Sequence, residues 1–215
     1  MTPAEQSRHA AGICALAPVI PVLVIEDAGS AADLARALVA GGLPALEVTL
    51  RTPAALDAIR AMADVPGGVV GAGTLLTPED VRAAKAAGAK FGVSPGATDR
   101  LLRACADEGL PLLPGAATAT EVMSLLEKGY TVQKFFPAEA SGGAPALGSI
   151  GAPIPQVGFC PTGGIGPAIV GDYLKLSNVL CVGGSWVAPK AAVAAGDWGK
   201  ITELARAASA LQRAA

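Results

Sequence analysis

Histidine, aromatic side chains and charge are all scarce in this sequence of 215 residues. It has one histidine, His9, and its aromatic and charged fractions are only 4% and 16%. A zinc site built from histidines and a Ser-His-Asp triad both need imidazoles that the chain lacks. Its 16 basic and 18 acidic residues give a formal net charge of -2, so there is no sequence-wide positive field for nucleic-acid phosphates. We therefore expect no metal and no nucleic-acid partner.

Long apolar runs without a break are missing too, although the mean hydropathy is high at +0.49. Two long uncharged stretches, residues 10–25 and 140–171, are interrupted by proline and glycine and do not predict a membrane helix. Glu5 is the first charged residue, whereas a signal peptide begins with a basic segment. The sequence predicts a cytoplasmic protein that does not bind a membrane.

Cysteine is sparse and shows no paired spacing. The four cysteines form no C-x-x-C motif and lie mostly in apolar surroundings; they are Cys14, Cys105, Cys160 and Cys181. A disulfide framework is not expected in a chain of this size. We interpret Cys160 and Cys181 as small core residues without a redox role.

Short apolar runs recur along the chain, each followed by a stretch of helical period. The eight predicted strands are residues 19–25, 45–50, 69–74, 90–94, 111–114, 131–136, 156–160 and 179–182. Helices are predicted at 30–40, 53–62, 78–87 and 98–108, with Ser30 and Thr77 as N-caps. Glycine favours the left-handed C-cap and follows predicted helix ends at Gly41, Gly88, Gly109 and Gly129.

Strict alternation of strand and helix implies right-handed crossovers and a parallel sheet. Eight such units are the number that closes a (β/α)8 TIM barrel, so we predict an α/β fold with a single barrel domain over residues 1–215. Residues 2–16 are expected to form an extra N-terminal helix that closes the bottom, and residues 198–213 the eighth outer helix. The rival is an open doubly wound sheet, but its dinucleotide fingerprint is missing because Leu76 replaces the third glycine.

Two charged residues interrupt apolar strands at positions suited to chemistry. Glu47 shares one face of its strand with Thr49 and Arg51, and Lys134 shares one with Val132 and Phe136. Both lie on even-numbered strands, which supply the same layer of a barrel interior, so they are expected to meet across the lumen. The pair can be a purely structural buried ion pair. Alternatively, burial lowers the pKa of a lysine amine, and a neutral amine can attack a ketone to form a Schiff base.

Glycine-rich turns follow the last two predicted strands, at residues 162–166 and 183–185. Loops at these places commonly form the phosphate site of such barrels. Glycine lets backbone N–H groups approach an anion, and the Ser185 hydroxyl adds a donor. Glycines can also serve only as tight turns. Because two such loops fall on the expected strands, we infer a phosphorylated substrate.

Six motifs, in order from about residue 18 to residue 197, resemble those of the class I 2-dehydro-3-deoxy-6-phosphogluconate (KDPG) aldolases, within the KDPG/KHG aldolase family. They are residues 47–52 (EVTLRT), 71–74 (GAGT), 93–96 (VSPG), 134–139 (KFFPAE), 160–165 (CPTGGI) and 183–186 (GGSW). The resemblance implies that Lys134 forms the imine and that Glu47 is the general acid/base. The substrate-binding residues that it implies are Arg51 and Thr74 for the keto-acid carboxylate, Pro95 and Phe136 for the walls of that pocket, and Gly163, Gly164, Gly184 and Ser185, near Thr162, for the phosphate.

The same resemblance implies a metal-independent lyase of the Entner–Doudoroff pathway that needs no cofactor and assembles as a homotrimer. Its expected reaction is cleavage of KDPG to pyruvate and glyceraldehyde 3-phosphate. Aldolases acting on 2-dehydro-3-deoxy-6-phosphogalactonate or 4-hydroxy-2-oxoglutarate (KHG) would use the same lysine and stay open as alternatives. A sugar-phosphate isomerase or epimerase is disfavoured by the scarcity of histidine. A non-catalytic sugar-phosphate binding protein would explain the glycine turns but not the pair of Glu47 and Lys134.

Overall fold

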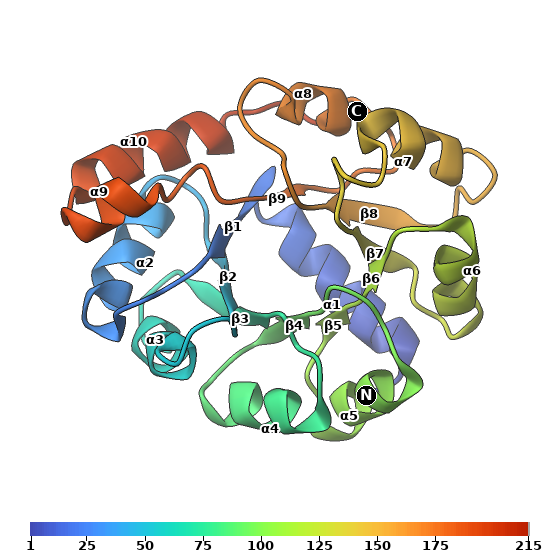
Figure 1. Cartoon of the computed structure of the whole chain (residues 1–215), viewed down its shortest axis with the longest axis horizontal. Coiled ribbons are helices and arrows are strands. Elements are labelled where there is room, and N and C mark those ends of the chain that lie inside the picture. Colours follow the sequence, from blue (N-terminus) through green and yellow to red (C-terminus); the bar gives the residue numbers. More distant parts are fainter. Residues whose placement is uncertain (215) are drawn as a thin grey trace.

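Parallel strands surround a common axis, and helices lie outside them (Figure 1). The computed structural model describes residues 1–214. The strands are β1 (Val19–Leu23), β2 (Ala45–Thr49), β3 (Val69–Gly73), β4 (Phe91–Val93), β5 (Leu112–Leu113), β6 (Gly115–Ala116), β7 (Val132–Phe135), β8 (Gly158–Pro161) and β9 (Val182–Gly184). They form a six-stranded sheet in the order β5-β4-β3-β2-β1-β9 and a three-stranded sheet in the order β6-β7-β8. The predicted α/β fold with parallel strands is confirmed.

The two sheets meet at both of their edges. Strands β5 and β6 flank Pro114, which has no N–H to donate to a ladder. Isolated parallel bridges join Phe159 to Val179 and Thr162 to Gly183. The predicted strand at 111–114 is therefore wrong in its extent, because the ladder breaks at Pro114 and resumes beyond it. The predicted strand at 179–182 is also misplaced, since β9 begins only at Val182.

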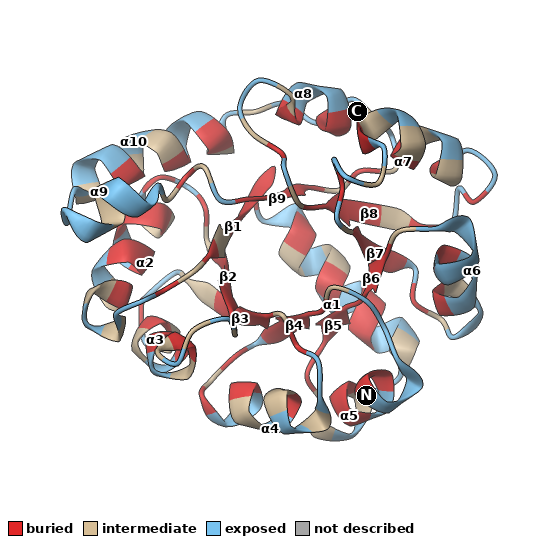
Figure 2. Ribbon diagram, viewed as in Figure 1, coloured by how far each residue is buried: buried red, intermediate tan, exposed pale blue. Residues whose placement is uncertain are grey.

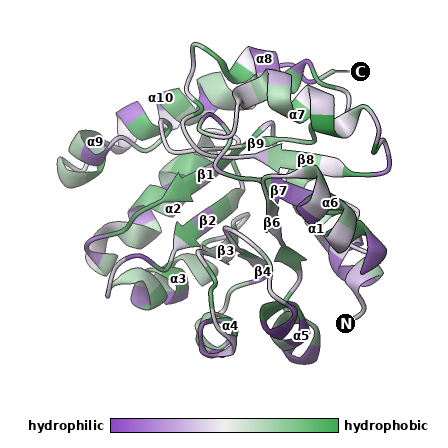
Figure 3. Ribbon diagram, turned by 45° about the vertical axis from the view of Figure 1, so that its right-hand side comes forward, coloured by the Kyte–Doolittle hydropathy of each residue, from purple (hydrophilic) through white to green (hydrophobic). Residues whose placement is uncertain are grey.

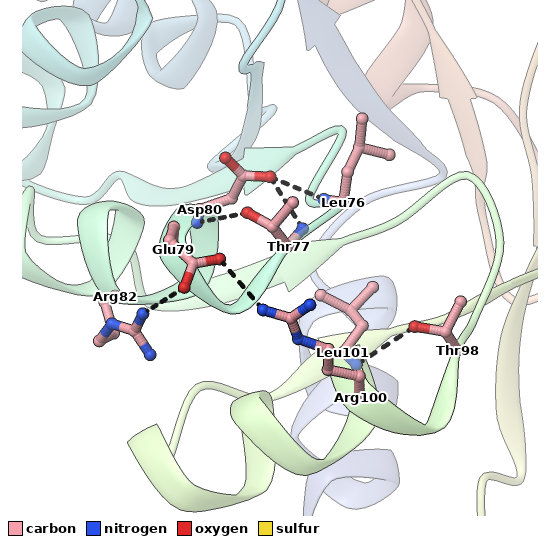
Figure 4. Close-up of polar contacts among 8 residues, drawn as sticks. All are labelled: Leu76, Thr77, Glu79, Asp80, Arg82, Thr98, Arg100 and Leu101. Carbon is pink, nitrogen blue, oxygen red and sulfur yellow. Dashed lines mark hydrogen bonds and ion pairs between the residues drawn. The ribbon is translucent and has the colours of Figure 1, made fainter.

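Helices alternate with the strands. They are α1 (Pro3–Ala15), α2 (Ala31–Ala40), α3 (Ala55–Ala63), α4 (Pro78–Ala86), α5 (Asp99–Glu108), α6 (Ala119–Glu127), α7 (Gly143–Gly151), α8 (Val170–Leu174), α9 (Lys190–Ala194) and α10 (Trp198–Ser209), with a 3-10 turn η1 (Ala28–Ser30) before α2. Thr77 caps α4 as predicted, since its hydroxyl accepts from Asp80 N while the Asp80 carboxylate accepts from Thr77 N (Figure 4). Thr98 caps α5 in the same figure through Leu101 N.

Ser30 and Gly41 are the cap positions of α2 as predicted, but the geometry of both caps differs from the prediction. Ser30 makes no side-chain capping bond to α2, because it belongs to the 3-10 turn whose own cap is Asp27. Gly41 has an ordinary φ of -82°, and the left-handed conformation falls one residue later, at Gly42, with φ +90°. The other three glycines, which do adopt positive φ after helix ends as predicted, are Gly88, Gly109 and Gly129.

Buried residues form two layers, one between strands and outer helices and one inside the ring of strands (Figure 2). Helix α1 crosses behind the strands in Figure 1 and contacts β5 and β7. Its Ala10 and Cys14 pack with Phe91, Cys160 and Cys181 in the inner layer. The predicted N-terminal helix thus fills the amino-terminal end of the strands, and the two strand cysteines are buried as predicted.

Hydropathy follows the same arrangement, with apolar residues along the strands and polar residues on the outer helix surfaces (Figure 3). Within residues 1–214 no helix is both long and apolar enough to cross a membrane. The candidate site residues lie on the strands and in the loops at their opposite, carboxyl-terminal ends.

Candidate active site

Glu47 on β2 and Lys134 on β7 meet inside the ring of strands. Lys134 Nζ lies 3.4 Å from Glu47 Oε1, and the two side chains are only 7% and 4% exposed. The strands are not neighbours, because β2 pairs with β1 and β3 whereas β7 pairs with β6 and β8. The predicted meeting across the lumen is therefore confirmed.

The glycine that ends β3 leaves the space that the Glu47 side chain occupies. A Cβ on Gly73 would lie 2.3 Å from Glu47 Oε1, far inside van der Waals contact. Gly73 pairs with Thr49 in the parallel register of β2 and β3. The second glycine of the Gly-Ala-Gly-Thr motif, Gly73, is thus required because a side chain there would collide with Glu47. The sequence alone did not reveal this requirement.

Burial and charge act on Glu47 in opposite directions. Removal from water raises the pKa of the Glu47 carboxyl above its ordinary value, and the nearby Lys134 ammonium only partly offsets this. The Phe136 ring lies 4.9 Å from Lys134 Nζ, within cation–π range. A carboxyl with a raised pKa keeps its proton to higher pH than an exposed glutamate does, which suits a general acid/base.

A cavity of about 150 Å³ opens at the carboxyl ends of the strands, next to Phe136, whose ring lies 4.9 Å from Lys134 Nζ. The predicted site residues that line it are Arg51, Phe136, Thr162, Gly163, Gly164 and Ser185. They come from loops after β2, β7, β8 and β9. The structure therefore brings together residues from the two predicted glycine turns, an arginine and the aromatic neighbour of Lys134.

The first glycine turn requires glycine for two reasons. Gly163 and Gly164 have φ of +108° and +81°, and a Cβ on Gly164 would lie 2.8 Å from Glu139 Cβ. Among residues 1–214, no protein group accepts a hydrogen bond from the backbone N–H of Gly163, Gly164 or Ser185. These amides line a cavity and lack protein acceptors, so they are available to an anion.

Five predicted site residues do not line this cavity, among them Glu47 and Lys134 themselves. Thr74 and Pro95 follow the carboxyl ends of β3 and β4, and Gly184 lies within β9, where a Cβ would be 1.9 Å from the Trp186 ring. Gly184 therefore has a packing role in the structure. Thr74 has a left-handed φ of +62°, which is unusual for a β-branched residue. Their predicted contacts with substrate stay predictions.

Three lining residues were not among the predicted substrate-binding residues, namely Val22, Ile165 and Gly183, although the last two lie in the predicted glycine turns. Gly183 leaves room for Thr162, since a Cβ there would lie 2.3 Å from Thr162 Oγ1. The isolated bridge between these two residues brings the β8 and β9 turns together. Adjacency of the last two strands was the available signal for Gly183. Val22 and Ile165 are ordinary apolar residues without such a signal.

A second cavity lies apart from the pair of Glu47 and Lys134. A larger cavity of about 470 Å³ lies between the β1 loop, α2 and α10, and includes Leu23 and Trp198 but none of the predicted site residues. Within residues 1–214, no three His, Cys, Asp or Glu side chains are grouped to hold a metal ion. The candidate site combines the Lys134 amine, the Glu47 carboxyl and a glycine turn whose amides lack acceptors within residues 1–214.

Fold and site together define an α/β protein with an amine and a carboxylate paired inside a ring of parallel strands. The sequence profile of the KDPG and KHG aldolase family matches residues 11–204. The 2-dehydro-3-deoxy-phosphogluconate aldolase of Pseudoalteromonas atlantica is 54% identical over 194 residues, which cover 90% of each chain. This chain belongs to the KDPG and KHG aldolase family.

Solved structures agree with this assignment. The 2-keto-3-deoxy-6-phosphogluconate aldolase of Zymomonas mobilis ZM4, crystallised with 3-phosphoglycerate, is 52% identical with a TM-score of 0.91, covering 97% of this chain and 98% of that chain. The KDPG aldolase of Legionella pneumophila, with pyruvate captured as a covalent carbinolamine, is 48% identical with a TM-score of 0.90, covering 93% of this chain and 98% of that chain. The resemblance stated from the motifs is confirmed.

Proposed function

We propose that this protein is a class I aldolase that cleaves KDPG to pyruvate and glyceraldehyde 3-phosphate, a reaction of the Entner–Doudoroff pathway. The observation that carries the proposal is the buried pair of Lys134 and Glu47, 3.4 Å apart. Membership of the aldolase family supports the same reaction. The pair supplies a nucleophile and a proton carrier, which are the two groups that Schiff-base chemistry requires.

Imine formation is the first step. The neutral amine of Lys134 attacks the C2 ketone to give a carbinolamine, and Glu47 delivers the proton with which the C2 oxygen leaves as water. The Phe136 ring, 4.9 Å from Nζ, favours the cationic iminium that results. Burial of Glu47, which raises its pKa, favours the protonated carboxyl that this step requires. The carbinolamine in the Legionella pneumophila aldolase supports this chemistry.

Carbon–carbon cleavage follows from the iminium. Glu47, now a carboxylate, takes the proton of the C4 hydroxyl, directly or through a water molecule. The electrons of the C3–C4 bond move into the iminium, which becomes a neutral enamine, and glyceraldehyde 3-phosphate leaves. Protonation of the enamine at C3 and hydrolysis of the new imine release pyruvate and regenerate Lys134.

Two anion sites hold the substrate ends. Arg51 and Thr74 bind the keto-acid carboxylate, with Pro95 and Phe136 shaping its pocket. The phosphate lies against the two glycine turns, where its partners are Thr162, Gly163, Gly164, Gly184 and Ser185. The free N–H groups of this cavity support the phosphate assignment, as does the 3-phosphoglycerate bound to the Zymomonas mobilis aldolase.

We infer further that the strands form one closed (β/α)8 TIM barrel domain over residues 1–215. In this description β5 and β6 are one strand interrupted at Pro114, and the bridges from Phe159 to Val179 and from Thr162 to Gly183 complete the ring. We also infer a homotrimer. A phosphorylated sugar acid is charged and does not cross membranes freely, so an enzyme that uses it belongs in the cytoplasm.

Cleavage of KDPG, measured by coupling pyruvate release to lactate dehydrogenase, tests the proposal. Lys134→Ala should abolish cleavage, whereas Lys175→Ala, which changes a 79% exposed lysine, should retain it. Comparison of KDPG with the phosphogalactonate epimer and with KHG tests the related aldolase reactions. If wild-type protein binds KDPG but cleaves none of the three substrates, the proposal fails and a binding role is favoured.

A further inference from the structure

Arg51 has a single side-chain partner, the hydroxyl of Thr49. Arg51 Nε lies 3.2 Å from Thr49 Oγ1, and no carboxylate of residues 1–214 forms an ion pair with its guanidinium. Arg51 lines a cavity together with Phe136, and its terminal nitrogens donate to no group of residues 1–214. An arginine on a flexible stem loses substantial rotamer entropy on ordering. The bond at Nε limits that freedom while leaving both terminal nitrogens available.

The direction of this hydrogen bond is fixed by a second contact. Thr49 Oγ1 lies 2.9 Å from the carbonyl oxygen of Leu23 on neighbouring β1. A carbonyl can only accept, so the hydroxyl donates its one proton to Leu23 and presents lone pairs to Arg51. The guanidinium can only donate. The chain of Arg51, Thr49 and Leu23 therefore has one consistent arrangement of donors and acceptors.

Thr49 is well suited to hold a neighbour in place. It is 2% exposed, lies within β2, and is β-branched, which stiffens its side chain at χ1. Its register partner Gly73 is the residue that makes room for Glu47. Thr49 and the proposed general acid/base therefore both lie on β2, held between β1 and β3.

We propose that Thr49 is a positioning residue that aims the Arg51 guanidinium at the substrate carboxylate. This inference depends on the proposed function, because it names the support for one of its anion sites. A guanidinium binds a carboxylate best through two parallel bonds from its planar fork. Fixing Nε orients the plane of that fork, so loss of the Thr49 hydroxyl should weaken substrate binding more than chemistry.

Thr49→Val removes the hydroxyl at nearly constant volume and is the principal test. KM for KDPG should rise about tenfold, as expected for one hydrogen bond to a charged group, with little change in kcat. The pyruvate concentration that half-saturates borohydride trapping on Lys134 should rise in parallel, since pyruvate carries the carboxylate but no phosphate. Competitive inhibition by inorganic phosphate should stay unchanged. Thr49→Ser should restore the wild-type values.

Thr52→Val is the matched control. The Thr52 hydroxyl donates to the carbonyl of Ile25 on the same β1 loop and makes no bond to Arg51. Its removal should lower thermal stability in the same way but leave KM unchanged. In an Arg51→Lys background, which lacks Nε, Thr49→Val should add no further rise in KM.

The outcomes separate the two proposals. If wild-type protein neither cleaves KDPG nor traps pyruvate on Lys134, the proposed function fails. If wild-type protein does both and Thr49→Val keeps wild-type KM, the positioning role alone is wrong. An equal rise in KM in the Arg51→Lys background, or weakened phosphate inhibition instead of pyruvate binding, would also overturn it. If Thr49→Val does not fold, Thr49→Ala replaces it in the same measurements, because it also removes the hydroxyl.

Discussion

At the scale of single residues, Glu47 is subject to two opposing effects, burial and the charge of Lys134. Burial is the larger, so the pKa of the folded state is raised above that of the unfolded chain. The folded state then binds the proton more tightly, and stability that is present at low pH is lost as the pH rises through the raised pKa. This sign is opposite to that of a carboxylate whose pKa is lowered by an ion pair.

Glu47→Gln should therefore become more stable relative to wild type as the pH rises from about 4 toward 7, starting from the ordinary glutamate range. The variant has no carboxyl to titrate but keeps its volume and an acceptor for Lys134. Urea unfolding midpoints of both proteins across this range measure the difference. A wild-type advantage that grows with pH would show that the Lys134 ion pair dominates burial instead.

Thr74 shows strain at the scale of one backbone position. Its φ of +62° is disfavoured for a β-branched residue by about 1 kcal/mol or more, whereas glycine adopts it freely. Thr74→Gly should raise the melting temperature while weakening KDPG binding, because the proposed carboxylate contact is lost. Thr74→Ala is the control, since it removes the hydroxyl but keeps the strain. Equal melting temperatures for the two variants would contradict this account.

At the scale of secondary-structure elements, β2 and β3 fit together only because Gly73 has no side chain. Gly73→Ala places a Cβ 2.3 Å from Glu47 Oε1, so Glu47 or the strand must move. We expect KDPG cleavage to fall by about tenfold or more, as is typical when a proton-transfer group is displaced. Gly171→Ala in α8, where a Cβ would meet nothing within 4 Å, should retain activity. Equal activity in both variants would show that Glu47 tolerates displacement.

The elements also show where sequence reasoning succeeded. The helix starts at Thr77 and Thr98 were predictable from the sequence. A threonine hydroxyl can accept a hydrogen bond from the free N–H three residues later, so threonine is a strong local indicator of a helix start. Ser30 is also a residue type that favours the N-cap, but the side chain of Asp27 caps the 3-10 turn that comes before α2. Helices α7 and α8 lie in a stretch rich in glycine and proline, where packing against the strands outweighs local propensity.

At the scale of the whole molecule, the meeting of Glu47 and Lys134 was predictable because strand alternation and layering are global rules. The residues that line the cavity were harder to predict from the sequence. Pro95 and Thr74 lie at strand ends but outside the cavity wall, because loop conformation rather than strand position decides which side chains reach it. Gly184 was assigned to phosphate from its motif, and its contact with Trp186 appears only in the folded chain.

Assembly is a property of the whole molecule as well. We expect three chains, each of 21.1 kDa, to associate in solution. Sedimentation equilibrium at micromolar protein concentration measures the assembled mass directly. A mass equal to one or two chains across the concentration range would contradict the proposed homotrimer but leave the site untouched.

The central claim is that Lys134 forms the covalent intermediate, and trapping it is the most direct test. Protein incubated with pyruvate is reduced with borohydride, digested and analysed by peptide mass spectrometry, with Lys134→Ala as the control. We predict one pyruvate-derived adduct per chain, confined to Lys134 and absent from the variant. No adduct, or an adduct on an exposed lysine such as Lys175, would contradict the Schiff-base mechanism.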